Sequence, residues 1–141
     1  MTPDFYIEHI GFVTNNLAKF ESFWCDLLGY KCIHESCGSE QMMKELFGAS
    51  EAVIKRYQKE GLLPDIEIHY FQDLKDCYQK FQRFGMNHIC LHTGGPGSRE
   101  VFIHSLPDNL KVHVYDNPRG WENIFMQDYE GNWIELRERI E

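Results

Sequence analysis

The sequence predicts an α+β fold made of two tandem βαβββ modules. The chain has 141 residues, the size of a single domain, and it repeats itself. Residues 9–14 read His-Ile-Gly-Phe-Val-Thr and residues 88–93 read His-Ile-Cys-Leu-His-Thr, while residues 66–68 (Ile-Glu-Ile) match residues 134–136 (Ile-Glu-Leu). A repeat fixes the architecture because each copy folds as the same unit. Each half therefore begins with a His-bearing strand and ends with a Glu-bearing strand.

The first half, residues 4–72, is predicted to hold four strands and two helices. Asn15-Asn16 offers a helix N-cap, and apolar residues then recur at helical spacing up to Gly29, a residue typical of helix C-termini. Residues 40–47 favour a short helix before Gly48. Periodicity leaves residues 52–58 open between helix and strand, and the repeat favours a strand. The predicted strands are 6–13, 30–35, 52–58 and 66–71, and the apolar face of the first helix comprises Leu17, Phe20, Trp24, Leu27 and Leu28.

Residues 73–85 are predicted to form a linker helix, because apolar residues recur in them at helical spacing before Gly85. The second half, residues 86–141, then contains a Gly-Gly-Pro-Gly turn and a turn at residues 128–132. Its predicted elements are strands 87–93, 110–116, 123–127 and 132–138 and a helix near 98–106.

Composition places the chain among ordinary globular proteins. Hydrophobic residues make up 43% and charged residues 26%, which excludes a disordered or collagen-like chain. The five cysteines are odd in number and form no C-x-x-C pair, so we expect reduced thiols. The sequence shows neither a secretory signal nor an apolar run of membrane-spanning length, and we expect a cytoplasmic protein without a membrane partner.

The charge balance argues against nucleic-acid binding. Lys and Arg number 14 against 22 Asp and Glu, giving a net charge of −8, and the basic residues are scattered. A negative field repels a phosphate backbone.

The repeated glutamates lie in an unusual setting. Side chains alternate between the two faces of a strand, so Glu67 and Glu135 lie opposite the Ile and Leu residues that flank them. We expect the flanking apolar side chains to pack against the helices, which leaves the glutamates and the strand histidines on the other face. A carboxylate among apolar neighbours is costly unless it is solvated, paired or coordinated.

The recurrence of His9 with Glu67, and of His88 with Glu135, indicates a metal site. A divalent cation compensates both carboxylates and accepts lone pairs from both imidazoles. Two nitrogen and two oxygen ligands suit Zn, Ni, Co, Mn or Fe(II). For any one of the four residues, a hydrogen-bonded histidine or a solvated glutamate is the alternative interpretation; their repetition as pairs favours the metal.

Four segments carry motifs that resemble one known family. They are residues 7–13 (Ile-Glu-His-Ile-Gly-Phe-Val), 23–29 (Phe-Trp-Cys-Asp-Leu-Leu-Gly), 88–89 (His-Ile) and 128–136 (Asp-Tyr-Glu-Gly-Asn-Trp-Ile-Glu-Leu). The second is similar to F-Y-x-x-x-L-G, and the last, the most specific, to D-x-x-G-N-x-I-E-L. Together they resemble the vicinal oxygen chelate superfamily, which includes glyoxalase I, epimerases, extradiol dioxygenases, fosfomycin-resistance proteins and bleomycin-binding proteins. The resemblance covers nearly the whole chain and implies a glyoxalase-like fold, with the two modules forming a curved mixed sheet around one metal site.

The resemblance implies that the metal ligands are His9, Glu67, His88 and Glu135, with one divalent metal ion per site. It also implies that a glutamate at the metal is the catalytic base, Glu135 first and Glu67 second. His69 lies two residues beyond Glu67 on the same face, so it is an alternative ligand to Glu67.

The implied activity is that of a glyoxalase, a lactoylglutathione lyase or an epimerase, in which the metal stabilises an enediolate or enolate of a small oxygenated substrate. Val13 stands where glyoxalase I usually has an Arg that contacts glutathione, which disfavours a glutathione thioester. An Fe(II) extradiol-type dioxygenase is an alternative, and the additional residues expected near substrate are His69, His92, His113 and Arg137. A non-catalytic binding or resistance protein is a third reading, which the intact ligand set disfavours. Members of the family commonly dimerise, so we expect a homodimer.

Overall fold

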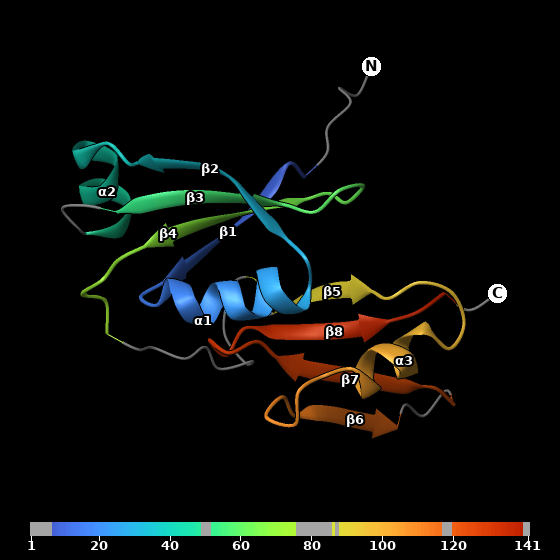
Figure 1. Cartoon of the computed structure of the whole chain (residues 1–141). Coiled ribbons are helices and arrows are strands. Elements are labelled where there is room, and N and C mark those ends of the chain that lie inside the picture. The colour runs from blue at the N-terminus through green and yellow to red at the C-terminus, as the bar shows by residue number, and fades with distance from the viewer. Residues whose placement is uncertain (1–6, 49–51, 76–85, 87, 117–119, 140–141) are drawn as a thin grey trace, which may run out of the picture. The chain divides into compact units, whose positions relative to one another are not determined.

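The computed structural model describes residues 7–48, 52–75, 86, 88–116 and 120–139 (Figure 1). The chain divides into two compact units, Met1–Asp76 and Cys77–Glu141, called module one and module two below. Each module contains a four-stranded sheet, with strand order β1-β4-β3-β2 in the first and β5-β8-β7-β6 in the second. In both sheets the first strand of the module lies beside its last, which confirms the predicted fold of two βαβββ modules.

The described residues of module one form a mixed sheet and three helical segments. Its first and last strands, β1 and β4, pair in parallel, whereas β2 with β3 and β3 with β4 are antiparallel. The elements are β1 (His9–Thr14), α1 (Leu17–Glu21), the π-helical η1 (Ser22–Leu27), β2 (Lys31–Cys37), α2 (Glu40–Phe47), β3 (Val53–Gln58) and β4 (Asp65–Tyr70).

Module two repeats this sheet with one described helix. Here β5 and β8 pair in parallel, and the other two pairings are antiparallel. The elements are β5 (His88–His92), α3 (Ser98–His104), β6 (Val112–Asp116), β7 (Glu122–Gln127) and β8 (Trp133–Arg137). The predicted strands and short helices are thus present within a few residues of their expected bounds. The predicted linker helix lies outside the described residues except for residues 73–75, which are not helical.

The first helix begins as the sequence predicts and then widens. Asn16 accepts a hydrogen bond from the Lys19 backbone at 3.1 Å, which caps α1. From Ser22 the chain is π-helical, with the Leu28 N–H donating to the Phe23 carbonyl five residues earlier. The wider turn changes the predicted apolar face: Phe23 is fully buried, while Leu27, expected on that face, is only half-buried.

One face of each sheet carries the core. In module one, α1 and η1 supply the rings of Phe20 and Trp24, which contact each other and, through Phe20, the Tyr57 ring of β3. The Ile and Leu residues that flank the two repeated glutamates are buried as predicted: Ile66, Ile68, Ile134 and Leu136. The glutamates therefore lie on the opposite faces of their sheets.

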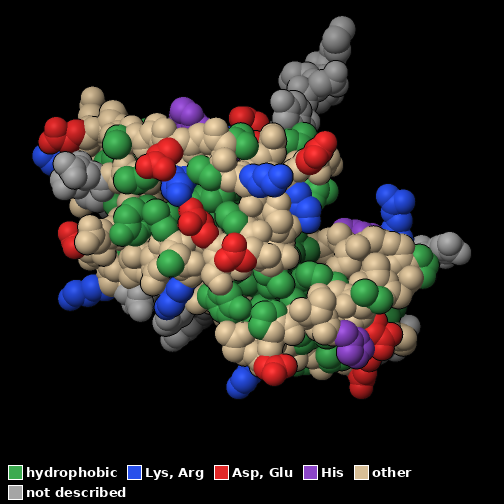
Figure 2. Space-filling view, in the orientation of Figure 1, with side chains coloured by type: hydrophobic (Ala, Val, Ile, Leu, Met, Phe, Trp, Pro, Cys, Tyr) green, Lys and Arg blue, Asp and Glu red, His purple; other side chains and the backbone are tan. Residues whose placement is uncertain are grey.

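The surface carries both signs of charge. On the face that Figure 2 shows, acidic and basic side chains lie interspersed. Among the described residues, no helix is long and apolar enough to cross a membrane. The described cysteines, Cys25, Cys32, Cys37 and Cys90, are free thiols, as expected.

Partly buried side-chain hydrogen bonds join α1 to the sheet of module one. Glu21 Oε1 accepts hydrogen bonds from Lys55 Nζ and from the Tyr57 hydroxyl, each at 2.7 Å. Partial burial opposes the charged carboxylate, but these two donors outweigh it, and the pKa of Glu21 is lowered. The hydrogen bond between Lys55 and Glu21 also raises the pKa of Lys55.

We expect Glu21→Gln to reduce stability in a pH-dependent way. A carboxylate with a lowered native pKa stabilises the fold above the unfolded value of 4.5, and that contribution disappears as pH falls through the native pKa. Glu21 is partly exposed, so solvent screening limits the loss to less than about 1 kcal/mol at neutral pH. Denaturant unfolding at pH 7 and at pH 3 measures it. Equal losses at both pH values would contradict a role for the ionised carboxylate.

Candidate metal centre

In module one, strand pairing brings His9 and Glu67 together. β1 and β4 pair in parallel with Gly11 opposite Glu67, so His9 lies diagonally beside Glu67 on the same face. The distance from His9 Nε2 to Glu67 Oε2 is 3.9 Å. The sequence prediction that this His and this Glu share a face is confirmed.

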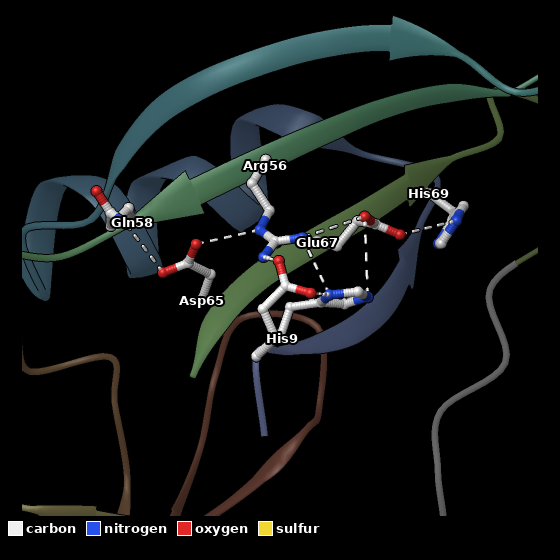
Figure 3. Close-up of polar contacts among 7 residues, drawn as sticks. His9, Arg56, Gln58, Asp65, Glu67 and His69 are labelled. Carbon is white, nitrogen blue, oxygen red and sulfur yellow. Dashed lines mark hydrogen bonds and ion pairs between the residues drawn. The ribbon is translucent and has the colours of Figure 1, made fainter. Parts of the chain in front are cut away.

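Polar side chains gather around His9 and Glu67 in what we call the module-one cluster, and Arg56 of β3 lies at its centre (Figure 3). The cluster comprises Glu8, His9, Arg56, Asp65, Glu67 and His69. Arg56 is paired with Glu67 in the antiparallel register, which places both side chains on one face. Its guanidinium donates to Glu8 Oε1 at 2.6 Å and to Asp65 Oδ2 at 3.2 Å, and it lies 3.7 Å from Glu67 Oε2. Burial disfavours the charged guanidinium, but the interactions with Glu8 and Asp65 outweigh that effect and raise the pKa of Arg56. One cation thus partly balances three carboxylates.

Arg56 also constrains the protonation of His9. Arg56 Nη1 lies 3.0 Å from His9 Nδ1, and because a guanidinium can only donate, Nδ1 is the acceptor. A neutral His9 in this contact carries its proton on Nε2, the nitrogen that faces Glu67. Metal binding at Nε2 requires the other tautomer, with Nδ1–H turned to an acceptor; Glu8 Oε2, 3.7 Å from Nδ1, is suitably placed.

His69 supports Glu67 from the other side. Its Nε2 lies 3.4 Å from Glu67 Oε1, and the side chain is largely buried. Burial lowers the pKa of His69, which favours the neutral imidazole that metals bind. His69 therefore remains close enough to Glu67 to act as a supporting residue or as the alternative ligand.

In module two, His88 and Glu135 form the equivalent pair. His88 Nε2 lies 3.5 Å from Glu135 Oε2, and the side chain of Glu135 is only 10% exposed. Arg137 Nε donates to Glu135 Oε1 at 3.0 Å, and this hydrogen bond raises the pKa of Arg137. The carboxylate is thereby held by a cation on one oxygen while the other oxygen faces the histidine.

The most specific sequence motif builds the turn that presents Glu135. Asp128 Oδ1 accepts the backbone N–H groups of Glu130 and Asn132, at 3.0 and 2.8 Å, and Asp128 Oδ2 accepts the Asn132 side chain at 2.8 Å. Gly131 adopts φ +83°, which favours glycine. The turn sets the β7–β8 register, in which Glu135 pairs with Phe125.

The strand pairings of the two sheets correspond in the rows around the repeated glutamates. In module one the cross-strand row through the glutamate is Gly11, Glu67, Arg56 and His34; in module two it is Cys90, Glu135, Phe125 and His113. Glu67 therefore corresponds to Glu135, and His69, two residues beyond, corresponds to Arg137. This correspondence favours Glu67 over His69 as the repeated ligand.

The two pairs fit a divalent cation in donor chemistry and in spacing. Imidazole nitrogens and carboxylate oxygens that share a metal at bonds of about 2.0–2.2 Å lie about 3–3.5 Å apart. The separations of 3.9 Å and 3.5 Å are close to this. Within the described part of the chain, no group of three or more potential ligands is close enough together to hold a metal ion.

The other residues predicted near the site have different surroundings. His92 pairs with Arg137 in the sheet and is exposed. His113 stacks on Tyr115 and contacts the Trp133 ring at 5.7 Å, on the face that carries Glu135. Arg56 was not predicted as a site residue, because its place beside Glu67 depends on the pairing of β3 with β4, which the sequence does not give.

Comparison with known proteins shows the fold. The structure of a glyoxalase family protein from Bacillus cereus is similar to this one, with 13% sequence identity and a TM-score of 0.75; the match covers 99% of this chain and 97% of the Bacillus cereus chain. The trypanothione-dependent glyoxalase I of Leishmania major matches 96% and 87%, with 14% identity and a TM-score of 0.67. The fosfomycin resistance protein FosX of Listeria monocytogenes, in complex with Mn(II), matches 94% and 90%, with 19% identity and a TM-score of 0.57.

No protein-family model and no curated protein sequence matches the chain. The structural matches confirm the predicted resemblance to the vicinal oxygen chelate superfamily at the level of the fold.

We expect Arg56→Met to destabilise module one by about 3 kcal/mol at neutral pH, because it leaves Asp65, with 8% side-chain exposure, without its cation. Urea unfolding at pH 7 measures the loss. Lys31→Met, at the exposed start of β2, serves as a control for loss of a strand cation. Arg56→Lys keeps the charge and should lose less; equal losses in Arg56→Lys and Arg56→Met would contradict charge balance as the cause.

Proposed function

We propose that this chain is a metal-dependent enzyme of the vicinal oxygen chelate type, of the glyoxalase, lactoylglutathione lyase or epimerase kind. The observation that carries the proposal is the repetition of a His–Glu pair at equivalent register positions of both sheets, with separations of 3.9 Å and 3.5 Å. Neither pair is explained by packing, since the core lies on the other face of each sheet.

In this proposal one divalent cation is bound by His9, Glu67, His88 and Glu135. The presence of Mn(II) in the structurally similar FosX supports a divalent metal in this fold. The donor set also suits Zn, Ni, Co and Fe(II). When bound, such a cation binds two neighbouring oxygens of a small-molecule substrate and stabilises negative charge that develops on them.

Glu135 is the preferred catalytic base. Its carboxylate is nearly buried, and Arg137 and His88 fix its orientation. Glu67, by contrast, lies in a cluster with Arg56, His9 and His69. We therefore assign to Glu135 the removal of a proton from the carbon next to a substrate carbonyl.

One observation supports a second candidate function, that of an Fe(II) dioxygenase of the extradiol type. That chemistry needs a proton-handling histidine close to the metal, and His69 lies 3.4 Å from Glu67 with its pKa lowered by burial. The metal preference separates the candidates, because iron favours oxygen chemistry and Ni, Co or Zn favours proton transfer. A non-catalytic binding protein is less well supported, since both His–Glu pairs are intact. We further propose that the protein is a cytoplasmic homodimer.

We expect His88→Ala and Glu135→Ala each to abolish stoichiometric metal, and His9→Ala and Glu67→Ala to do the same, because each removes one of four ligands. Elemental analysis after purification without chelators measures the occupancy. His104→Ala, a change on α3 remote in sequence from both pairs, is the control and should keep the metal. Full occupancy in both His88→Ala and Glu135→Ala would show the assignment to be wrong.

We expect Glu135→Gln to keep the fold but lose catalysis, because the substitution is nearly isosteric while the amide cannot accept the proton. The loss should be about 10²–10⁴-fold, the usual contribution of a general base. Deuterium exchange from solvent into 2-oxo thiohemiacetals and branched acyl thioesters measures it. Glu138→Gln, outside β8, is the matched control. No exchange by metal-loaded wild type, with oxygen uptake on catechols when iron is supplied, would favour the dioxygenase.

A further inference from the structure

We propose that Cys25 and Cys32 form an oxidisable dithiol, a modification site of module one that a hydroperoxide converts into an intramolecular disulfide. The two thiols belong to the helix-covered face of the sheet, whereas the module-one cluster lies on the other face. The modification needs neither a bound metal nor a substrate of the enzyme. It is therefore independent of the proposed function.

Strand pairing places Cys32 on the side of the sheet that carries the core. Cys32 of β2 pairs with Tyr57 of β3, so the two side chains lie on one face. Tyr57 is fully buried and contacts Phe20 of α1, with ring centroids 5.1 Å apart. Because β2 is the edge strand, Cys32 is exposed although it lies on this face.

The end of the first helix brings Cys25 to the same place. Glu21 accepts a hydrogen bond from the Tyr57 hydroxyl at 2.7 Å, which fixes this end of the helix over the residue that pairs with Cys32. Cys25 follows Glu21 by four residues, so the two side chains are neighbours on the helix surface. Gly29 then adopts φ +80° and donates its N–H to the Cys25 carbonyl at 3.0 Å. The chain therefore turns back toward β2 directly after Cys25.

The electrostatics of this face agree with the placement of the two thiols. Lys55 Nζ lies 2.7 Å from Glu21 Oε1 and 5.7 Å from the centroid of the Tyr57 ring. Burial raises the pKa of the Cys25 thiol to about 11, and negative charges that include Glu21 and Cys32 add to this effect. Burial and the Glu21 hydrogen bond raise the pKa of Tyr57. The charges of Cys32 and Cys25 act on Tyr57 in the same direction, so both thiols influence one phenol.

The two thiols differ in accessibility, which sets the order of the reaction. Cys32 is exposed, and its thiol donates a hydrogen bond to the His34 carbonyl at 3.6 Å. Cys25 is half-buried, and with a pKa of about 11 it is protonated at neutral pH. The thiolate is the form of cysteine that attacks an oxidant. Cys32 therefore reacts first with a hydroperoxide from solvent, and Cys25 is the thiol that resolves the product.

The reaction consumes one molecule of hydrogen peroxide. The Cys32 thiolate attacks one peroxide oxygen, the O–O bond breaks, and the departing hydroxide takes up the proton that Cys32 released. This step gives the sulfenic acid of Cys32 and one water. The Cys25 sulfur then attacks the Cys32 sulfur, the S–O bond breaks, and the departing hydroxide takes the Cys25 proton to form a second water. Two thiols are thus oxidised to a disulfide that ties η1 to the edge strand β2.

Cys37, the other described cysteine of module one, is not placed to form the disulfide with Cys32. Both residues belong to β2, five positions apart. A strand rises about 3.3 Å per residue, so their Cα atoms are separated by roughly 15 Å. A disulfide requires a Cα separation below about 7 Å. Cys25 is therefore the partner that the fold offers to Cys32 among the described cysteines of this module.

The test uses the full-length chain, reduced and kept in a metal chelator. The tryptic peptides 20–31 and 32–44 contain Cys25 and Cys32, and the second also contains Cys37. We therefore use Cys37→Ser, which should keep the dithiol. We expect one equivalent of hydrogen peroxide to join the two peptides, with a combined mass lower by two hydrogen atoms, and dithiothreitol to separate them again. Mass spectrometry of the unreduced digest measures the link.

Single serine variants test the order of the two steps. In Cys25→Ser we expect the sulfenic acid of Cys32 to persist and to be captured by dimedone. With Cys25 present, the disulfide forms instead and this labelling is lost. In Cys32→Ser we expect Cys25 to remain a thiol under the same treatment, because it is half-buried and protonated.

Absence of a link between peptides 20–31 and 32–44 in Cys37→Ser would overturn the proposal. A link that joins two chains, seen as a doubled mass on a non-reducing gel, would overturn it as well. Because the chelator removes any bound metal, failure of the proposed function would leave the result of this experiment unchanged.

Discussion

The parallel pairing of the first and last strands of each module is the constraint on which the candidate site depends. It brings together two residues that are far apart in the sequence, to 3.9 Å for His9 and Glu67 and to 3.5 Å for His88 and Glu135. The apolar residues on the reverse face fix the register, because a slip by one residue would expose Ile66 and its equivalents and bury the glutamates. Packing on one face therefore positions the chemistry on the other.

The fold and the two His–Glu pairs could be predicted from the sequence because the signals that specify them are local and occur twice. Alternation around Glu67 and Glu135 assigns each to a face without any knowledge of strand order. The Asp128 turn is equally local, since its hydrogen bonds close within five residues and start β8 at a defined point. Asn16 likewise fixes the beginning of α1 through a contact three residues ahead.

What the sequence could not predict depends on which strands are neighbours. Arg56 becomes part of the module-one cluster only because β3 pairs with β4 in a register that sets it opposite Glu67. Phe23 entered the core because the helix widened to a π-turn, which the 3.6-residue period does not describe. The aromatic character of the Glu135 face is also a cross-strand property, since Phe125, His113 and Trp133 lie on three different strands.

The two sheets share a backbone plan but differ in how they balance charge. In module one, Arg56 is 17% exposed and bridges several carboxylates, so Glu67 keeps a nearby cation whether or not a metal is bound. In module two, Arg137 is 61% exposed, and solvent screens much of its effect on Glu135, whose other neighbours include the ring of Phe125. Glu135 therefore takes its orientation from His88 and from one exposed cation, whereas Glu67 lies in a network of several charges. In the function we propose, the network of module one positions a metal ligand and Glu135 of module two takes the proton.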